Sequence, residues 1–280
     1  MRRETVRLAG VAVVAALVAG GLGFAVAERG EEGHASEPGA QRAPSGSGDL
    51  PRGAEPVKVD PASFTTNIDN RYWPMKPGTR WTYRAVESGT ASDVMVTVSN
   101  VTRKMANGVT ARVVRDTVSE GGTVTEDTFD WYAQDAHGNI WYMGEQTAEY
   151  ENGKVATRAG SWEAGVDGAM PGVALPADPV DGMSYRQEYM KGNAEDAGEV
   201  LSVQEQAESP AGHYTDALLT KDTTPLEPMV AEYKLYAPRV GPVLTLGASG
   251  GSEREALVGV THVDAATAHA VGTTPLGKAY

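Results

Sequence analysis

The sequence predicts an all-β fold, in which one antiparallel meander of about eleven or twelve strands curves into a half-open or closed barrel. Three observations lead to this fold class. Short runs of alternating apolar and polar residues recur between Gly-rich turns. No convincing helical periodicity follows the first 27 residues. The chain has no cysteine, so a single sizeable core must stabilise it in place of disulfides.

The first six expected strands are separated by tight turns. Asn107-Gly108 and Asn152-Gly153 are typical of type I′ hairpins, and Asp135 to Gly138 has Asp and Gly where a four-residue turn prefers them. The expected strands span residues 80–87, 92–105, 109–118, 123–134, 139–150 and 154–162.

The regular pattern stops at residues 163–183, which contain three prolines and several glycines. It resumes in a second series of expected strands at 184–190, 198–207, 213–222, 229–237, 242–248 and 253–263. So many short antiparallel strands need a sheet without long exposed edges. This favours a strongly curved or closed barrel over the alternative, a sandwich.

The N-terminus has the features of an export leader. Arg2, Arg3 and Arg7 precede an uncharged run from Leu8 to Ala27, and Ala25-Val26-Ala27 fits an A-x-A cleavage site. The run of 20 residues is also just long enough to span a bilayer as a helix. Residues 1–27 are therefore a signal peptide or an uncleaved N-terminal anchor, and both place the body outside the cytoplasm, secreted or anchored.

The remaining boundaries follow from composition. Residues 28–56 consist mainly of Gly, Pro, Ala, Ser and charged residues, which predicts a disordered linker. By the same reasoning residues 265–280 are expected to form a flexible tail. The β domain then spans residues 57–264.

The chain is acidic, with a formal net charge of −13 at pH 7. This charge argues against nucleic acid and against an anionic membrane surface as partners. Contact with the membrane is expected only through the N-terminal segment. The charge also favours solubility and permits cations to bind.

Two stretches are especially distinctive, "DWYAQDAHGNIWYMGE" (130–145) and "GSWEAGVDGAMPG" (160–172). They resemble a widespread family of exported bacterial proteins that has no assigned activity, and the resemblance extends over about residues 64–261. It implies one domain and offers no catalytic residues. More loosely, "YWPMKPGTRWTY" (72–83) followed by antiparallel strands resembles periplasmic carrier-like or lipocalin-like half-barrels.

Catalytic motifs are weak. Gly247 to Gly251 fits G-x-S-x-G formally, but no helix is expected after it, so it indicates a hairpin turn and no nucleophile elbow. Carboxylates are the remaining chemical groups, and they are dense in one third of the chain: Asp130, Asp135, Glu145, Glu149, Glu163, Asp167, Glu188, Glu195 and Asp196. They are interpreted as solvated surface groups, a Ca²⁺ site or a glycosidase-type pair. Glu163 and Asp167 are the candidate metal ligands, and no other cofactor is expected.

Aromatic residues are concentrated on consecutive expected strands. Because neighbours in a strand point to opposite faces, Trp131 and Tyr132 cannot share a face, nor can Trp141 and Tyr142. Either they form cross-strand pairs that stabilise the sheet, or they line a site for a small molecule. The candidate ligand-binding residues are Trp131, Trp141, Trp162, Tyr185, Gln187 and Tyr189.

These patterns lead to a ranked set of functional hypotheses. The first is an extracytoplasmic binding or carrier module for a small, apolar or amphiphilic ligand, with the 161–183 loop as a lid; a purely structural plug is the alternative role for that loop. The second is a structural or interaction protein of the cell envelope with a protein partner and no small ligand. The third is a Ca²⁺-dependent or carboxylate-based hydrolase.

Overall fold

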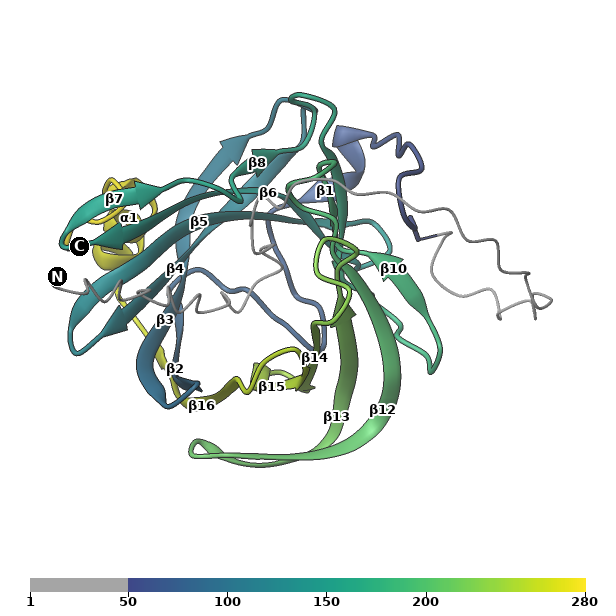
Figure 1. The fold of residues 1–280 in the computed structure, drawn as a ribbon. Coiled ribbons are helices and arrows are strands. Elements are labelled where there is room, and N and C mark those ends of the chain that lie inside the picture. Colours follow the sequence, from purple (N-terminus) through teal and green to yellow (C-terminus); the bar gives the residue numbers. More distant parts are fainter. Residues whose placement is uncertain (1–49) are drawn as a thin grey trace, which may run out of the picture.

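The computed structural model describes residues 50–280 (Figure 1). The predicted leader (1–27) and the predicted linker up to residue 49 lie outside the described residues. Within the described part, no helix combines the length and the apolar character needed to cross a membrane.

The described chain folds into a single sheet with one short α-helix. A 3₁₀ turn, η1 (Pro61–Ser63), comes first, and helix α1 (Ala265–Thr273) comes last. The strands of the first half are β1 (Phe64–Thr65), β2 (Thr79–Glu87), β3 (Thr90–Lys104), β4 (Thr110–Glu120), β5 (Thr123–Asp135), β6 (Ile140–Glu151), β7 (Lys154–Thr157), β8 (Trp162–Glu163) and β9 (Met170–Leu175). Those of the second half are β10 (Ser184–Arg186), β11 (Glu188–Tyr189), β12 (Ala197–Ser209), β13 (Gly212–Thr223), β14 (Ala231–Ala237), β15 (Gly241–Ser249) and β16 (Arg254–His262).

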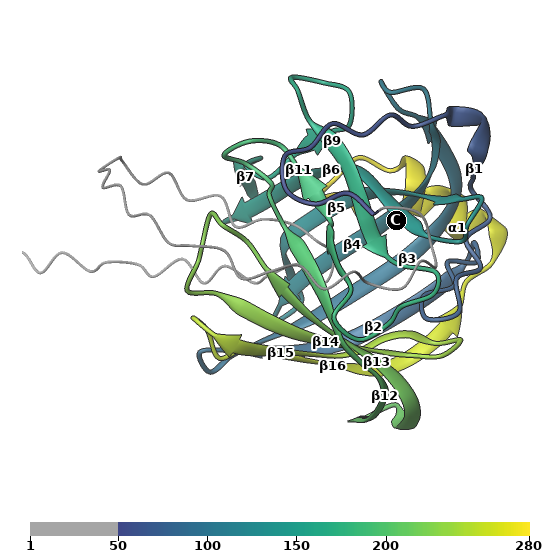
Figure 2. The same ribbon diagram turned by 90° about the vertical axis from the view of Figure 1, so that its right-hand side faces the viewer.

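All pairings in the sheet are antiparallel, so the all-β prediction is confirmed. The strands follow the order β10-β12-β13-β14-β15-β16-β2-β3-β4-β5-β6-β9-β11, with β1 attached to β5 and with β7 and β8 attached to β6. The expected count was lower because β1 and the short strands between residues 162 and 189 lack a clear alternating pattern. Figures 1 and 2 show the sheet curved into a barrel, seen along its axis and from the side.

The two ends of the sheet meet where the chain passes from β10 to β11. β10 pairs with β12, β11 pairs with β9, and only Gln187 separates the two strands in sequence. Arg186 fastens this seam, since its guanidinium donates to the Pro171 carbonyl on β9 at 3.0 Å. One kinked segment thus belongs to both ends of the sheet, and the barrel is nearly closed.

The antiparallel order places the turns at two opposite ends of the barrel. One end, here called the turn end, holds the hairpin turns Ser88-Gly89, Gly121-Gly122 and Asn152-Gly153 and the β13–β14 and β15–β16 connections. In these three hairpins both turn residues have positive φ, as type I′ requires. The prediction is therefore confirmed for Asn152-Gly153. It is wrong for Asn107-Gly108, where only Gly108 has positive φ.

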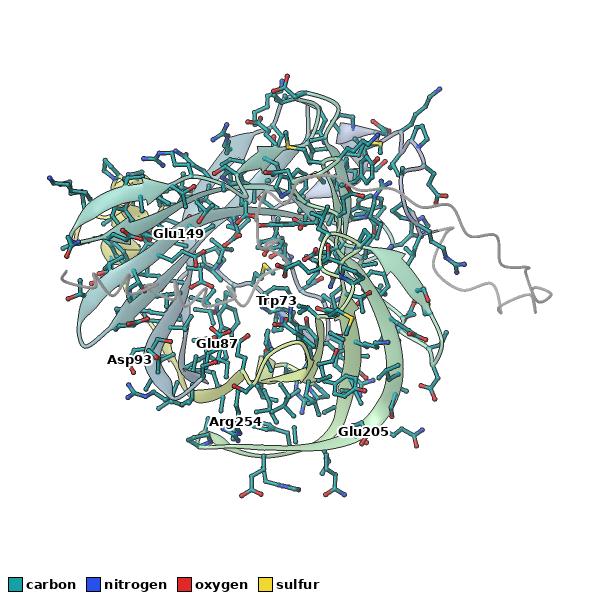
Figure 3. All side chains as sticks on the ribbon, in the orientation of Figure 1. Trp73, Glu87, Asp93, Glu149, Glu205 and Arg254 are labelled. Atoms are coloured by element: carbon teal, nitrogen blue, oxygen red, sulfur yellow. The ribbon has the colours of Figure 1, made fainter. Side chains whose placement is uncertain are left out.

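The opposite end is closed by residues 66–78, here called the plug. Its side chains Ile68, Tyr72, Trp73 and Met75 are buried. Asn70 donates from its side-chain amide to the carbonyls of Gly138 and Pro176, both at 3.1 Å. In Figure 3, which looks along the barrel, Trp73 lies near the centre of the ring of strands. The plug therefore seals this end with apolar surface.

The predicted lid is part of the barrel wall. Residues 170–175 form β9, which pairs with β6 and β11, and Trp162 and Glu163 form β8 against β6. Pro171 is tolerated because β11 pairs with β9 through only two residues, Glu188↔Pro171 and Tyr189↔Met170. The prolines and glycines that indicated a loop instead allow the close packing of a short strand at the seam.

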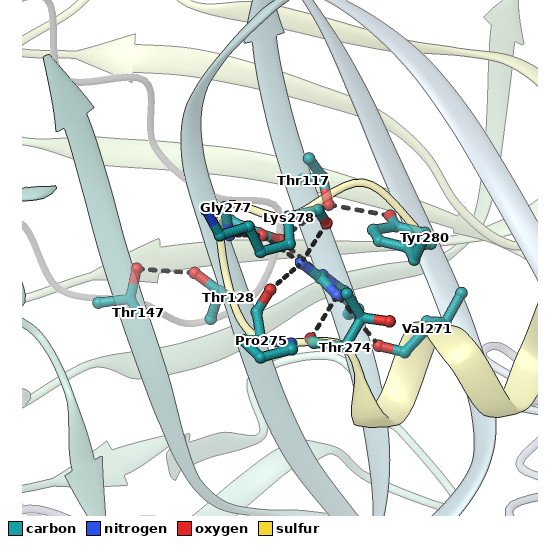
Figure 4. Close-up of polar contacts among 11 residues, drawn as sticks. Thr117, Thr128, Thr147, Val271, Thr274, Pro275, Gly277, Lys278 and Tyr280 are labelled. Carbon is teal, nitrogen blue, oxygen red and sulfur yellow. Dashed lines mark hydrogen bonds and ion pairs between the residues drawn. The ribbon is translucent and has the colours of Figure 1, made fainter. Parts of the chain in front are cut away.

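The predicted flexible tail, residues 265–280, is ordered on the outer face of the barrel. Asp264 caps α1 through its carboxylate, which accepts from the Thr267 amide at 2.7 Å, and the helix packs on β3 and β4. Beyond the helix, the buried Arg115 of β4 donates to the carbonyls of Val271, Thr274, Pro275 and Lys278, as drawn in Figure 4. Composition did not predict this order, because the segment is held by Arg115 and by Asp127, which form a buried ion pair beneath it.

The end of the predicted linker is ordered as well. Residues 50–56 lie against the seam, where Arg186 donates to the carbonyls of Gly53 and Glu55 at 2.7 and 2.8 Å and its amide donates to Pro51. These contacts are made by backbone carbonyl groups, which composition does not reveal. The ordered domain thus includes residues 50–56, which the sequence assigned to the linker.

Substituting Gly172→Ala tests the seam. A Cβ atom on Gly172 would collide with the backbone of Gln187, where no flexible side chain can give way. We expect a loss of about 3 kcal/mol in the free energy of unfolding, measured by urea denaturation. Gly259→Ala is the control, because its Cβ would meet nothing within 4 Å. Equal stability of the two variants would contradict this account of closure.

Substituting Arg115→Gln tests the ordered C-terminus. Arg115 forms a buried ion pair with Asp127, whose carboxylate also accepts from the Gly277 amide at 2.6 Å. Removing one partner of a buried pair costs about 3–5 kcal/mol, so the urea midpoint should fall sharply. Arg84→Gln, which breaks the exposed pair with Asp93, should cost less than about 1 kcal/mol. An unchanged urea midpoint in the Arg115→Gln variant would show that the ordered C-terminal segment contributes little to the free energy of unfolding.

Candidate functional site

Carboxylates point into the barrel from nearly every part of the wall. On β5 the inward residues are Glu126, Thr128, Asp130 and Tyr132, because Asp127 on the other face pairs with Arg115 under α1. The cross-strand partners of inward residues also point inward. This argument, together with the mutual electrostatic influence of the side chains, assigns the following carboxylates to the interior: Glu87, Asp116, Glu126, Asp130, Glu145, Glu149, Glu188, Asp196, Asp222, Glu232, Glu253 and Glu255.

Four of them form what is here called the acidic wall: Asp116 on β4, Asp130 on β5, Glu145 on β6 and Glu255 on β16. All four are buried, and Asp116 and Glu255 are each only 2% exposed. Both carboxylate oxygens of Asp116 and of Glu255 lack a hydrogen-bond partner, as does Oδ2 of Asp130. A buried polar group without a partner is costly, so these oxygens are the strongest indication of a binding site.

Burial sets the protonation of the acidic wall. Desolvation, followed by the charge of Asp130, raises the pKa of Asp116 well above its usual value, and only a backbone contact from Thr117 opposes this. Desolvation and the charge of Asp116 likewise raise the pKa of Glu255, and the charge of Lys234 opposes this shift. For Asp130, desolvation raises the pKa to about 7 although the Tyr142 hydroxyl donates to it at 2.7 Å. The carboxylates of the interior therefore raise one another's pKa values.

Lys234 of β14 supplies a positive charge two strands away from Glu255. Its Nζ lies 2.9 Å from Asp222 Oδ2 on the neighbouring strand β13 and 3.7 Å from Glu232 Oε2 on the same strand. These carboxylates hold the pKa of Lys234 above its usual value against the opposing effect of burial. Lys234 therefore stays charged and neutralises part of the interior.

Aromatic rings cover the space between the plug and the acidic wall. Trp73 of the plug lies 5.5 Å from the Tyr132 ring and 6.0 Å from the Tyr236 ring, centroid to centroid. Tyr132 stacks on Tyr142 at 4.9 Å, and Trp162 meets Tyr142 edge-on at 5.4 Å. The interior is thus aromatic at the plugged end and acidic further toward the turn end. Apolar surface combined with a few convergent polar groups is typical of small-molecule sites.

Uncharged polar groups in the interior also lack partners. These are the hydroxyls of Tyr132, Tyr185 and Thr245 and the side-chain oxygen of Gln187, all on residues less than 9% exposed. They come from β5, the seam and β15, and so surround the interior together with the acidic wall. They offer a ligand additional hydrogen bonds.

Two of the predicted ligand-binding residues lie on the outer face. The Arg103 guanidinium lies 4.0 Å above the Trp131 ring, and the Trp141 indole donates to Asp135 at 2.8 Å. Strand alternation therefore sends Tyr132 and Tyr142, and not the two tryptophans, into the barrel. Trp162 does face inward, where its indole donates to Glu188 Oε2 at 2.9 Å.

The expected face of Tyr185, Gln187 and Tyr189 is broken by the seam. Tyr185 and Gln187 face the interior, and the Gln187 side chain donates to Asp222 at 3.2 Å. After the kink the buried Glu188 faces inward, while the half-buried Tyr189 lies 5.7 Å from the Arg186 guanidinium on the other side. The strand changes partner at Gln187, so simple alternation does not continue through it.

Glu163 and Asp167, the two candidate metal ligands, lie outside the acidic wall and in different surroundings. Glu163 accepts from Arg103 at 2.6 Å and from the Ala106 amide at 2.9 Å, using one oxygen for each. Asp167 is exposed in a turn, with φ of 50°. Across residues 50–280, no group of three or more His, Cys, Asp or Glu side chains is arranged to hold a metal ion.

The G-x-S-x-G match falls at the end of β15. Ser249 donates its hydroxyl to the Met229 carbonyl at 2.9 Å, and β16 follows after a short turn. The expected hairpin turn is confirmed.

Sequence reasoning identified several interior carboxylates without recognising that they point inward. Asp130, Glu145, Glu188 and Asp196 were candidates, but solvation was the favoured interpretation. The signal was present in the alternation Glu126-Thr128-Asp130-Tyr132, where every inward position is polar. Asp116 was missed because its inward neighbours on β4, Val114 and Val118, are apolar, and Glu255 was missed because the apolar Leu257 follows it on the same face.

Comparisons with known proteins give weak similarity in structure alone. No family model and no curated protein matches the chain. A predicted lipoprotein from Parabacteroides distasonis has 14% identity and a TM-score of 0.39, covering 69% of this chain and 99% of its own. A predicted exported protein with a YmcC-like fold from Bacteroides fragilis has 16% identity and a TM-score of 0.38, covering 68% and 99%. A β-barrel-like protein of a domain of unknown function from Brucella abortus has 14% identity and a TM-score of 0.34, covering 66% and 98%.

These three neighbours are exported, lipoprotein-like or barrel-like proteins, which is the class that the sequence motifs resemble. The TM-scores are too low to support an argument about function. The family resemblance drawn from the motifs remains a prediction.

The stability of the ligand-free protein should fall as the pH rises. Burial raises the pKa of Asp196 to about 6, of Glu126 and Asp130 to about 7 and of Glu253 to about 8. The unfolded chain releases these protons near pH 4, whereas the folded chain retains them. The free energy of unfolding should therefore decrease between about pH 4 and pH 8, by about 1.4 kcal/mol per pH unit for each titrating group.

Urea denaturation at pH 5, 6, 7 and 8 measures this slope. Asp130→Asn should make the slope shallower, because it removes one of the titrating groups. Glu208→Gln, at an exposed position on β12, should leave the slope unchanged. A flat profile in the unmodified protein would contradict the raised pKa values.

Proposed function

We propose that this chain is an extracytoplasmic binding module that holds a small, partly apolar molecule inside the barrel. The observation that carries the proposal is the set of buried interior oxygens without partners, on Asp116, Asp130, Tyr132, Tyr185, Gln187, Thr245 and Glu255. A ligand that supplied hydrogen bonds to them would relieve a large desolvation cost.

The architecture supports this proposal. The plug closes one end with aromatic surface, so a ligand's apolar part has a place to lie. Glu87, Glu149 and Glu232 near the turn end are partly exposed, unlike the acidic wall. Entry is therefore proposed at the turn end, past these carboxylates. Figure 3 shows Glu87 within the ring of strands, whereas Asp93, Glu205 and Arg254 lie on its outside.

The extracytoplasmic location rests on the leader-like sequence of residues 1–27. The envelope-interaction hypothesis needs no occupied interior, and this is where the two hypotheses differ. A hydrolase would need a substrate in the same interior and turnover in addition to binding.

Native mass spectrometry of the mature chain, purified from an exporting host, tests the proposal. Extra mass that is lost on denaturation would show a bound molecule, and its value would identify the chemical class. Thr245→Tyr should abolish the extra mass, because Thr245 lies inside next to Lys234 and Glu255 in the sheet. Thr261→Tyr adds the same side chain at an exposed position and should retain it.

A bare chain mass at every gentle setting would overturn the binding proposal in favour of an envelope-interaction role. Bound mass that survives in Thr245→Tyr, with the variant folded, would place the ligand outside the barrel.

A further inference from the structure

We propose that the acidic wall recognises its ligand by positive charge, so that the barrel binds an organic cation carrying an ammonium or guanidinium group. This inference rests on the proposed binding function and specifies the chemical class of the ligand. It is carried by three features of the interior: the kind of polar atom left without a partner, the placement of the cations already present, and the aromatic rings beside the acids.

The interior offers acceptors and lacks donors. The partnerless atoms on Asp116, Asp130, Gln187, Glu188 and Glu255 are carboxylate or amide oxygens, which can only accept when the acids are ionised. Among the partnerless atoms assigned to the interior, the hydroxyls of Tyr132, Tyr185 and Thr245 could also donate. A ligand that complements this set must itself donate several hydrogen bonds, as ammonium and guanidinium groups do.

The buried cations of the described chain are paired with groups outside the acidic wall. Lys234 is held by Asp222 and Glu232, and it lies two strands from Glu255, whose pKa it lowers. Arg115 pairs with Asp127 on the outer face, and Arg112 donates to the carbonyls of Thr66, Ser99 and Val101 near the plug. The groups that most affect Asp116 and Glu145 are other carboxylates. Among residues 50–280 no lysine or arginine forms an ion pair with Asp116, Asp130, Glu145 or Glu255, and Lys234 acts on Glu255 only from a distance.

Lys234 shows how this interior accommodates an ammonium group. Its Nζ is buried, and it is held by carboxylates of the two neighbouring inward positions, Asp222 and Glu232. The acidic wall presents a similar arrangement on β4, β5 and β6, where Asp130 lies directly opposite Glu145 in the sheet. In place of a lysine, this side of the barrel has partnerless oxygens.

The arrangement favours an organic cation over Ca²⁺. Calcium needs six to eight oxygens within about 2.3–2.6 Å, and no cluster of that kind occurs in residues 50–280. The Tyr132 and Tyr142 rings stack beside Asp130, and Trp73 and Trp162 extend the aromatic surface. Aromatic faces next to carboxylates attract ammonium and guanidinium groups and also contact the apolar part of such molecules.

The test is calorimetric titration of the mature chain at pH 8, after removal of bound molecules by denaturing dialysis and refolding. The probes are tryptamine, spermidine and agmatine, with tryptophol as the neutral match for tryptamine and calcium chloride as the metal. We expect saturable binding of one molecule per chain for at least one amine, and binding of tryptophol at least tenfold weaker than that of tryptamine. Proton release, measured in two buffers, should accompany binding as the wall ionises.

Variants locate the site. Asp116→Asn and Glu255→Gln should each weaken amine binding at least tenfold, whereas Glu208→Gln on the outside should not. The same two interior variants should unfold at higher temperature than the unmodified chain without ligand, because each removes a buried charge among like charges. A purely structural role for these carboxylates predicts a lower unfolding temperature instead.

Three outcomes would overturn the inference. Equal binding of tryptophol and tryptamine would show recognition without charge and leave the binding function standing. Stoichiometric Ca²⁺ binding that displaces the amines would assign the wall to a metal. The absence of saturable binding for all three amines, with the interior variants still unfolding at higher temperature, would show that protons alone neutralise the wall.

Discussion

The structure depends on one constraint, the closure of the sheet at Gln187. The segment from Ser184 to Tyr189 completes both ends of the sheet, and Gly172 permits the approach because a side chain there would strike the Gln187 backbone. Closure removes the exposed edges that a curved sheet of this size would otherwise present. It also separates the interior from solvent, and that separation gives the inward carboxylates their unusual properties.

A closed barrel usually fills its interior with apolar side chains, and this one does so only near the plug. Trp73, Trp81, Tyr132 and Tyr236 form an ordinary core there, whereas the acidic wall lies where apolar residues would be more stable. A protein selected for stability alone would not retain Asp116 and Glu255 without partners. Departures of this kind from stable packing are expected at functional sites.

The sequence predicted the all-β class, the antiparallel meander and the curved barrel, because alternation and turn residues are local signals. It also predicted that Tyr132 and Trp131 would face opposite sides. It could not tell which side was inside, since both faces of β5 are largely buried, one by the interior and one by Arg103 and neighbouring segments. The candidate set therefore included Trp131 and Trp141 and omitted Tyr132, Tyr142, Asp116 and Glu255.

Other features depend on contacts between distant residues and could not be read locally. The ordered C-terminus needs Arg115, whose guanidinium reaches carbonyls more than 150 positions away. Strand β9 of the barrel was interpreted as part of a lid, because proline and glycine, here Pro171 and Gly172, usually mark loops. The seam reverses the facing of Glu188 and Tyr189, which alternation alone assigns the other way.

The pairing of β2 with β16 has a consequence for the order of events in the life of the chain. Trp81 aligns with Val260, so strands near opposite ends of the domain must meet before the sheet can be completed. Contacts between residues so far apart in sequence make folding slow, because a long loop must close before they stabilise anything. Until β16 is in place, β2 has one unpaired edge, and such an edge can pair with the strands of another chain.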